Sequence, residues 1–386
     1  TSGLSIDALS QALPADVRPR FCGIHFFNPP RYMRLVEIIA TRTTDAGTLD
    51  ALETWLTSRL GKGVIRALDT PNFVANRIGV LSILAVMHHT QRFELGFDVV
   101  DALTGPKIGR PKSATYRTAD VVGLDTLAHV VRNMHGTLPD DPWHAHFKVP
   151  AWLEQLIAQG ALGQKTKGGI YRKVGKEVHV LDLGLQDFRP SSGELSAEVA
   201  GILKDRNPAS RFAALRASKD PQAKFLWAIF RDVFHYAAVQ LESIADNARD
   251  LDLAMRWGFG WTQGPFEIWQ SAGWADIARA IAADIAAGET MSDTPLPAWV
   301  LEDREGVHTP QGSWSPRRKA YVPRSALPVY QRQLFQEAVL GDGSLAPEQS
   351  GETLFENDGV RLWRLPAVDA GIGILSFKSK MHAIGS

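Results

Sequence analysis

Hydrophobic and polar positions in the first 70 residues alternate in a way that predicts short strands around one helix. Apolar runs predict three strands, at Phe21–Phe27, Leu35–Ala40 and Gly63–Leu68. Asp45–Leu60 has helical spacing, with Thr44 as the candidate N-cap and Gly61 just past its end. This pattern is typical of the last part of an α/β domain and is too short for a complete one.

From Asn76 onward the hydrophobic period becomes helical. Asn76–Leu95 is apolar on most faces, which predicts a buried central helix. Further helices are predicted at Asp98–Leu103, Asp120–His135 and Trp152–Gln159. The glycine pair before Tyr171 then predicts a hairpin that closes this unit.

A second helical stretch repeats features of the first. Phe225–Ile244 is again long and apolar, and the second stretch shares three spaced positions with the first: Asp101 with Asp252, Gly109 with Gly260, and Gly123 with Gly273, the last pair with one residue of slippage. Helical bundles of similar size can share such features by chance. A duplicated helical domain is the interpretation we favour.

These patterns predict a mainly α chain with a partial α/β N-terminal portion and a duplicated helical domain. We expect the parts to be the α/β remnant (1–70), two helical domains (71–185 and 186–304), a linker rich in Pro, Gly, Ser and Arg (305–352) and the start of another domain (353–386). In that last part Val360–Leu365 and Gly371–Phe377 are predicted to be strands.

Composition excludes several classes of function. Lys+Arg and Asp+Glu both number 42 in 386 residues, so net charge recruits neither nucleic acid nor an anionic membrane. The longest apolar run, Ile78–Met87, is about half of a membrane span. Cys22 is the single cysteine and no secretory or transit segment is visible at the N-terminus, so we expect a cytoplasmic protein.

A histidine and a glutamate carry the first candidate chemistry. If the strands holding His25 and Glu37 pair antiparallel across a connection centred on Arg31, the two residues fall opposite one another. A carboxylate beside an imidazole fixes its tautomer and raises its basicity, as a general base requires. By spacing alone, the favoured interpretation is a core histidine bonded to a backbone carbonyl, with Glu37 at a solvated strand end.

Asn76 is the second candidate. Pro71 suits the first turn of a helix, so the Asn76 amide would lie near the helix start, where it could hold a substrate oxygen. A capping or helix–helix hydrogen bond is the alternative.

Other chemistry-bearing motifs are missing from the sequence. It contains no G-x-x-x-x-G-K-[ST] phosphate loop, no G-x-S-x-G elbow and no G-x-G-x-x-G dinucleotide motif. The His88-His89 pair and the His144-x-His146 pair lack the spacing of a zinc site, so we expect no metal and interpret them as surface or loop histidines.

Taken together, several segments resemble the 3-hydroxyacyl-CoA dehydrogenase family, and among its members the multifunctional β-oxidation proteins. The resemblance runs from Ser2 to about Tyr171. Its motifs are the Thr1-Ser2 opening, His25-Phe26-Phe27-Asn28-Pro29, Leu35-Val36-Glu37, Pro71 through Asn76-Arg77, and Gly163-Gln164-Lys165-Thr166-Lys167-Gly168-Gly169.

The resemblance implies a role for each matching residue. His25 resembles the base that takes the proton of the substrate C3 hydroxyl, and Glu37 its carboxylate partner. Ser2 and Asn76 resemble the groups that bind the reacting oxygen. Ser2, Asn28 and Lys165 match positions that contact the cofactor, NAD. Gly3 departs from a serine found in many members.

The resemblance also implies an activity, oxidation of (3S)-3-hydroxyacyl-CoA to 3-ketoacyl-CoA within fatty-acid β-oxidation, with an acyl-CoA thioester as the substrate. The N-terminal portion resembles the final strands of a Rossmann-type NAD-binding domain. The glycine-rich half of that domain would precede Thr1, so we expect the chain to be an incomplete fragment. The duplicated unit resembles the family's dimer folded within one chain, a pseudo-dimer, and a further homo-oligomer is compatible with it. The tail is similar to the first strands of an enoyl-CoA hydratase (crotonase) domain.

Two alternatives remain at this point, the first of a different functional class and the second a related enzyme. One is a non-catalytic acyl-CoA-binding or scaffold segment of a multifunctional protein. The other is a dehydrogenase acting on a free 3-hydroxy acid.

Overall fold

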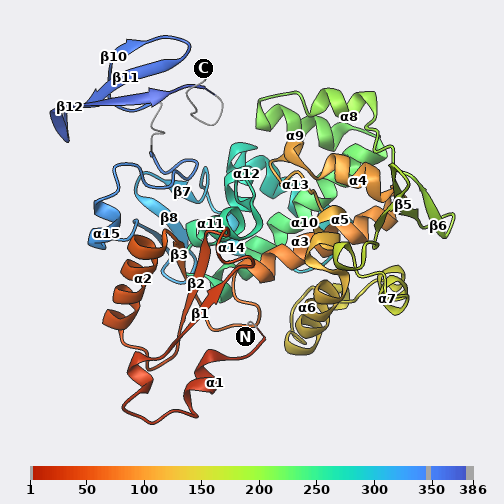
Figure 1. The fold of residues 1–386 in the computed structure, drawn as a ribbon, viewed down its shortest axis with the longest axis horizontal. Helices are drawn as coiled ribbons and strands as arrows, with labels where there is room; N and C mark the ends of the chain where they lie inside the picture. The colour runs from red at the N-terminus through yellow and green to blue at the C-terminus, as the bar shows by residue number, and fades with distance from the viewer. Residues whose placement is uncertain (1–2, 345–348, 380–386) are drawn as a thin grey trace.

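The computed structural model of the chain describes residues 3–344 and 349–379. A small α/β portion at the N-terminus packs against a large helical body, and a separate three-stranded sheet follows near the C-terminus (Figure 1). The mainly α fold with an α/β start agrees with the sequence prediction.

The α/β portion is a three-stranded sheet, with strand order β1-β2-β3. Its elements are α1 (Ile6–Ser10), η1 (Arg18–Arg20), β1 (Cys22–Phe26), β2 (Leu35–Ala40), α2 (Ala46–Leu60) and β3 (Gly63–Ala67). Strand β1 is antiparallel to β2, whereas β3 is parallel to β2. The three strands and the helix confirm the predicted elements to within one or two residues.

Side chains of β2 alternate between two covered faces of this sheet. Val36 and Ile38 pack with Leu49 and Leu56 of α2. Leu35 and Ile39 belong to the core of the helical body instead. Because Glu37 lies between these two on the same face, its side chain points to the helical side as well, where it contacts the start of α3.

The first helical unit follows β3 and ends in a small sheet. Its elements are α3 (Ala75–Arg92), α4 (Phe97–Leu103), η2 (Pro106–Ile108), α5 (Tyr116–Val122), α6 (Leu124–Thr137), η3 (His144–His146), α7 (Ala151–Ala158), η4 (Gln164–Thr166), β4 (Tyr171–Val174), β5 (Glu177–Asp182) and β6 (Asp187–Pro190). The predicted single helix at Asp120–His135 is wrong. Gly123, at φ +100°, breaks it into α5 and α6, a backbone angle that a side chain would disfavour.

A second helical unit has the same general order, helices and then a small antiparallel sheet. Its elements are α8 (Ala197–Ile202), α9 (Pro208–Ala217), α10 (Pro221–Ile244), α11 (Ala248–Phe259), α12 (Pro265–Ser271), α13 (Trp274–Ala286), α14 (Ala298–Leu301), β7 (His308–Thr309), β8 (Gly312–Ser315) and β9 (Ala320–Val322). Residues 305–352, expected to be a linker, thus contain β7–β9, and all of β8 is buried.

The C-terminal part begins with α15 (Pro328–Gln331) and continues with β10 (Glu352–Glu356), β11 (Val360–Leu365) and β12 (Asp369–Phe377). The two strands predicted here are confirmed. Strand β11 pairs with both neighbours, and Trp363 is buried against Phe335. The end of the predicted 353–386 domain, residues 380–386, lies outside the described residues.

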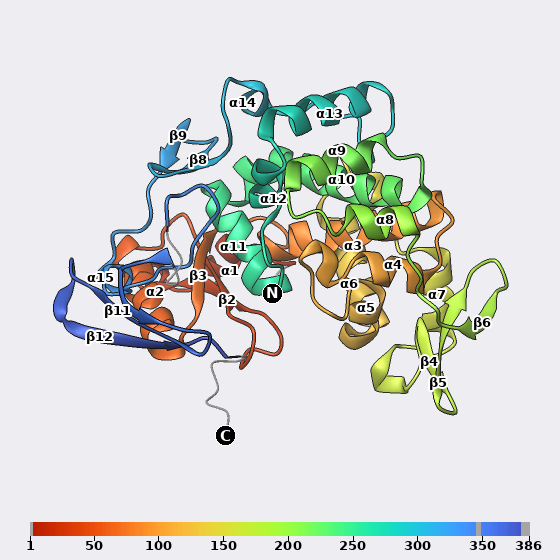
Figure 2. The same ribbon diagram turned by 90° about the horizontal axis from the view of Figure 1, so that it is seen from above.

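The long helices α3 and α10 cross at the centre of the helical body (Figure 2). Buried polar contacts join Arg77 to Gln240 near one end and His89 to Asp232 near the other, so the two helices run antiparallel. His89 is fully buried, which makes the interpretation of that histidine as a surface or loop residue wrong. The local pattern could not show Asp232, which lies 143 positions away.

One predicted cap is also wrong. Asp45, not Thr44, caps α2, by accepting a hydrogen bond from the Thr48 N–H at 3.0 Å. The Thr44 hydroxyl donates instead to the Phe21 carbonyl at 2.6 Å, which ties the helix start to β1. No helix among the described residues is both long and apolar enough to cross a membrane.

Candidate functional site

The sheet brings His25 and Glu37 face to face. The two residues are direct partners in the β1–β2 register. His25 Nδ1 lies 2.6 Å from Glu37 Oε2. The Glu37 carboxylate is fully buried, whereas the His25 side chain is 17% exposed. The pair therefore has its acid inside and the free edge of its imidazole toward the surface.

The start of helix α3 holds the other carboxylate oxygen. The backbone N–H groups of Val74 and Ala75 donate to Glu37 Oε1 at 3.1 and 2.9 Å. These groups lie at the N-terminus of α3, where the helix dipole favours an anion. Burial of a carboxylate is costly unless its oxygens are hydrogen-bonded, so the two N–H groups at the helix start offset the cost of burying Glu37 beside the imidazole.

The aromatic rings of Phe27 and Phe73 pack against the His25 imidazole. The rings of Phe27 and Phe73 meet the His25 ring edge-on, with centroids at 4.8 and 5.4 Å. Asn72 and Phe73 both have positive φ, +65° and +51°, which is a strained conformation for residues with side chains. The surrounding packing must hold this turn in place.

Asn76, Asn28 and Ser2 are further residues predicted for the site around His25 and Glu37. Asn76 is the second residue of α3, directly after the N–H groups that bind Glu37; it is half-buried and makes no side-chain hydrogen bond to the described residues. Asn28 is exposed just past the end of β1. Ser2 lies outside the described residues.

Lys165 has a different environment from the one expected. It is exposed in η4, and its ammonium lies 2.6 Å from both carboxylate oxygens of Asp125 at the start of α6. The structure thus brings His25, Glu37 and Asn76 together, and it pairs Lys165 with an acid.

Asn133 and Arg77 had no role in the sequence analysis. A Cβ on Gly3 would lie 2.4 Å from Asn133 Nδ2 of α6, so the N-terminal segment passes directly over that amide. Arg77 belongs to the Asn76-Arg77 motif but was given no role of its own. It is only 5% exposed, which is unusual for an arginine. A charged residue in a helix that is apolar on most faces was the signal, since such a charge needs a buried partner.

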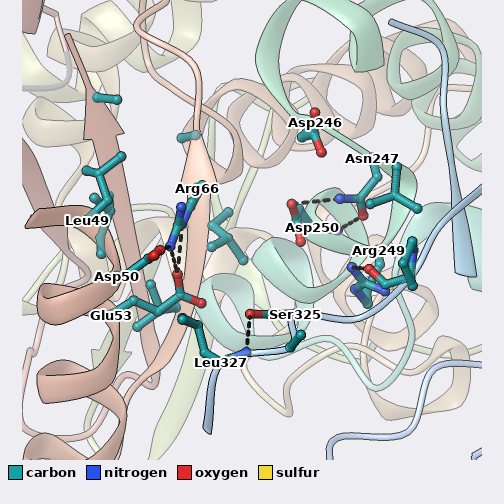
Figure 3. A pocket seen from close by; sticks show the side chains of 18 of the residues that line it. Leu49, Asp50, Glu53, Arg66, Asp246, Asn247, Arg249, Asp250, Ser325 and Leu327 are labelled. Carbon is teal, nitrogen blue, oxygen red and sulfur yellow. Dashed lines mark hydrogen bonds and ion pairs between the residues drawn. The ribbon is translucent and has the colours of Figure 1, made fainter. Parts of the chain in front are cut away.

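A cavity of about 620 Å³ lies elsewhere, between the α/β portion and the second helical unit. Figure 3 shows Asp50, Glu53 and Arg66 on one wall and Asp250 and Arg249 on the other. Arg66 is neutralised by ion pairs with Asp50 and Glu53. The lining includes neither His25 nor Glu37, so the cavity is separate from the candidate site.

Two consecutive parts of the chain match known protein families. Residues 1–70 match the family described as 3-hydroxyacyl-CoA dehydrogenase, NAD binding domain, and residues 73–173 match 3-hydroxyacyl-CoA dehydrogenase, C-terminal domain. The chain belongs to the 3-hydroxyacyl-CoA dehydrogenase family. This is a family of oxidoreductases, and NAD is the cofactor of its N-terminal domain.

Two relatives extend the similarity beyond residue 173. A probable 3-hydroxyacyl-CoA dehydrogenase of Bacillus subtilis is 36% identical over 302 residues, which cover 78% of this chain and 37% of that protein. A putative fatty acid oxidation complex trifunctional enzyme of Rickettsia prowazekii is 29% identical over 273 residues, 69% of this chain and 36% of that protein. The chain therefore spans little more than a third of either relative.

A solved structure shares the fold. The 3-hydroxybutyryl-CoA dehydrogenase of Escherichia coli aligns with a TM-score of 0.56 at 19% identity, over 78% of this chain and 73% of that one. At this identity the likeness concerns the fold alone.

Proposed function

We propose that the chain carries the catalytic base of an NAD-dependent (3S)-3-hydroxyacyl-CoA dehydrogenase, which oxidises 3-hydroxyacyl-CoA to 3-ketoacyl-CoA in fatty-acid β-oxidation. The observation that carries this proposal is the 2.6 Å contact between His25 and a buried Glu37. Such a pair is the arrangement that removes a proton from an alcohol.

Each group then has one task. Because Nδ1 donates to Glu37, the neutral imidazole presents Nε2 as the proton acceptor for the C3 hydroxyl. Glu37 stabilises the imidazolium that forms, and its two bonds from α3 keep it in place. The Asn76 amide, next along α3, is positioned to donate to the reacting oxygen, a task that Ser2 would share.

The fit to NAD is partial within this sequence. Bound NAD would accept the hydride that leaves C3. Asn28, exposed at the end of β1, is free to contact it, and Lys165 could do so only by giving up its ion pair with Asp125. A glycine-rich pyrophosphate loop is not among the 386 residues, so these groups fit the nicotinamide end of the cofactor.

We also propose that the helical units are a duplication folded as an internal pseudo-dimer. Asp101 accepts from the backbone N–H groups found 14 and 15 positions later, Thr115 and Tyr116. Asp252 accepts from those at the same two offsets, Phe266 and Glu267. Two aspartates that each hold the start of the following helix in one way support a common origin.

The small sheets support the same proposal. Asp120 accepts from the N–H groups of Ile170 and Tyr171, and Gln270 Oε1 accepts from those of Val307 and His308. The Tyr171 hydroxyl and His308 Nε2 then lie 2.8 Å from Asp101 and Asp252, respectively. By this correspondence β7–β9 belongs to the second unit, which would extend past residue 304.

Contacts between the units are reciprocal, as a two-fold arrangement requires. The Gly109 carbonyl accepts from the Thr262 N–H at 2.8 Å. A Cβ on Gly109 would meet Thr262, and a Cβ on Gly260 would meet Pro111. Thr262 lies two positions after Gly260, and Pro111 lies two positions after Gly109. Each glycine therefore contacts the same relative position in the other unit.

Replacement of the histidine tests the proposed reaction. We expect His25→Ala in the full-length protein to lower kcat for reduction of acetoacetyl-CoA by NADH by about 1,000-fold or more, since the proton carrier is lost. The loss of NADH absorbance measures the rate. His129→Ala, which changes an exposed histidine on α6, is the matched control. A His25→Ala variant within twofold of the parent would refute the assignment.

A further inference from the structure

Arg77, at the third position of α3, is buried where a cation is unfavourable. The positive end of the helix dipole lies at this turn, and the side chain is 5% exposed. Its free energy of burial must be offset by partners with good geometry.

Those partners come from two other parts of the chain. Arg77 Nη2 lies 2.7 Å from Asp141 Oδ2, in the loop after α6. Arg77 Nε donates to the Tyr236 hydroxyl at 2.6 Å, and Nη2 also donates to Gln240 Oε1 at 3.2 Å. Tyr236 and Gln240 belong to α10 of the second helical unit.

The network closes on itself. The Tyr236 hydroxyl donates to Asp141 Oδ2 at 3.0 Å, and Gln240 Nε2 donates to the same oxygen at 3.2 Å. Tyr236 is fully buried and Gln240 is 6% exposed. Because each member has its partners fixed by another, the guanidinium has a single position.

The same guanidinium holds the turn before α3. Arg77 Nη1 donates to the Pro71 carbonyl at 3.2 Å. Pro71 directly precedes Asn72 and Phe73, the two residues with positive φ. Strain of this kind persists only where surrounding contacts over-determine the backbone. The next N–H groups along the chain, those of Val74 and Ala75, are the donors to Glu37.

A second contact from the same unit reaches this turn. A Cβ on Gly258 of α11 would lie 3.4 Å from Ala75 Cβ, 3.4 Å from the Phe27 ring and 2.7 Å from Leu35, so α11 lies directly against the helix start and the sheet. The second unit therefore touches the first turn of α3 through both α10 and α11.

We propose that Tyr236 and Gln240 are positioning residues for the reaction, and that the second helical unit serves the active site of the first through Arg77. The proposal rests on the proposed function. Asp252 and Gly260 of the second unit each lie 151 positions after their counterparts in the first unit, Asp101 and Gly109. The same offset applied to Asn76 and Arg77 leads to Trp227 and Ala228. The second unit thus lacks these two polar residues and contributes support instead.

A pair of tyrosine variants tests the coupling. Tyr236→Phe removes one buried hydroxyl beside Arg77, and Tyr116→Phe removes an equally buried hydroxyl that donates to Thr90 at 2.8 Å. We expect Tyr236→Phe to lower kcat for acetoacetyl-CoA reduction about 10-fold while KM changes less than about twofold, because misplacement of the base affects the transition state and not substrate binding. Tyr116→Phe should leave both within about twofold.

A readout independent of turnover separates this proposal from the proposed function. The NMR signal of the His25 Nδ1–H proton, which bonds Glu37, should move upfield in Tyr236→Phe, since this contact loosens, and should stay unchanged in Tyr116→Phe. Gln240→Leu, which removes the neighbouring contact to Arg77, should act in the same direction. Both α10 variants matching Tyr116→Phe in this NMR signal and in kcat would overturn the proposal. Activity retained by His25→Ala would overturn the proposed function and leave the NMR result interpretable.

Discussion

At the scale of single residues, Glu37 is fixed through both of its oxygens. One contacts His25 Nδ1 and the other accepts the two N–H groups at the start of α3. The carboxylate cannot rotate without breaking one set of bonds. The orientation and tautomer of the imidazole are therefore set by a residue that is itself held by a helix.

This arrangement predicts the effect of an amide at position 37. In Glu37→Gln the amide NH₂ would face His25 Nδ1, which would then have to accept, so that Nε2 carries the proton and cannot act as a base. We expect kcat to fall by about 1,000-fold or more with little change in fold. The NADH assay measures the rate and far-UV circular dichroism checks the fold. Activity near the parent value would show that Glu37 does not set the tautomer.

At the scale of elements, α11 interlocks with the sheet and with α3 through alternating large and small residues. The rings of Trp257 and Phe259 cover Gly63 of β3 and Gly79 of α3, and between them Gly258 lies under Leu35. Glycine allows the backbones to approach, and the rings fill the space that remains. As a result, α11 packs closely against the start of α3, whose backbone N–H groups bind Glu37.

This close packing predicts that alanine substitutions at two helical glycines change the free energy of unfolding in opposite directions. A Cβ on Gly79 would lie 2.0 Å from the Phe259 ring, whereas a Cβ on Gly136 of α6 meets nothing within 4 Å. We expect Gly79→Ala to lower the free energy of unfolding by about 1–3 kcal/mol. Gly136→Ala should raise it by about 0.4–1 kcal/mol, because it restricts the unfolded chain. Urea unfolding measures both, and equal effects would contradict the packing account.

At the scale of the whole molecule, the α/β portion is joined to the second helical unit by the segment that follows β9. Glu337 in this segment pairs with Arg34, just before β2, and with Arg256 of α11. The segment also lines the cavity of Figure 3, opposite α2 and β3. Three distant parts of the chain thus surround one charged cavity.

Asp250 makes this junction sensitive to pH. Burial raises the pKa of Asp250 to about 6; Arg249 opposes this shift, and Asp246 and Glu53 add to it. A carboxyl whose pKa is raised on folding stabilises the protein below its unfolded pKa of about 4, and this stability is lost as pH rises to about 6. We expect a loss of about 2 kcal/mol between these values.

Asp250→Asn should remove that loss. Melting temperatures measured from pH 4 to pH 8 should fall less steeply between pH 4 and 6 in this variant than in the parent. Asp140→Asn, at an exposed site, should follow the parent curve. An unchanged slope in Asp250→Asn would mean that another group titrates at the junction.

Local pattern alone determined much of this protein. Alternation of side chains in β1 and β2 places His25 opposite Glu37 once the two strands are taken to pair antiparallel, because strand register follows from the period of two. The motif resemblance, and not this spacing, favoured a catalytic pair over a core histidine. The helical period that starts at Asn76 placed this residue near the start of a helix. Helix ends were less determined: neighbouring Thr44 and Asp45 can both cap, and only the contact of Thr44 with the Phe21 carbonyl decides between them.

Only the tertiary structure decided what surrounds the pair. The N–H groups that hold Glu37 come from 37 and 38 positions later, and the Tyr236 hydroxyl that holds Arg77 comes from 159 positions later. Hydrophobic periodicity reports which face of an element is buried and not which other element covers it. Partners across α3, α10 and α11 depend on how whole helices pack, so their identity emerges only when the chain is folded.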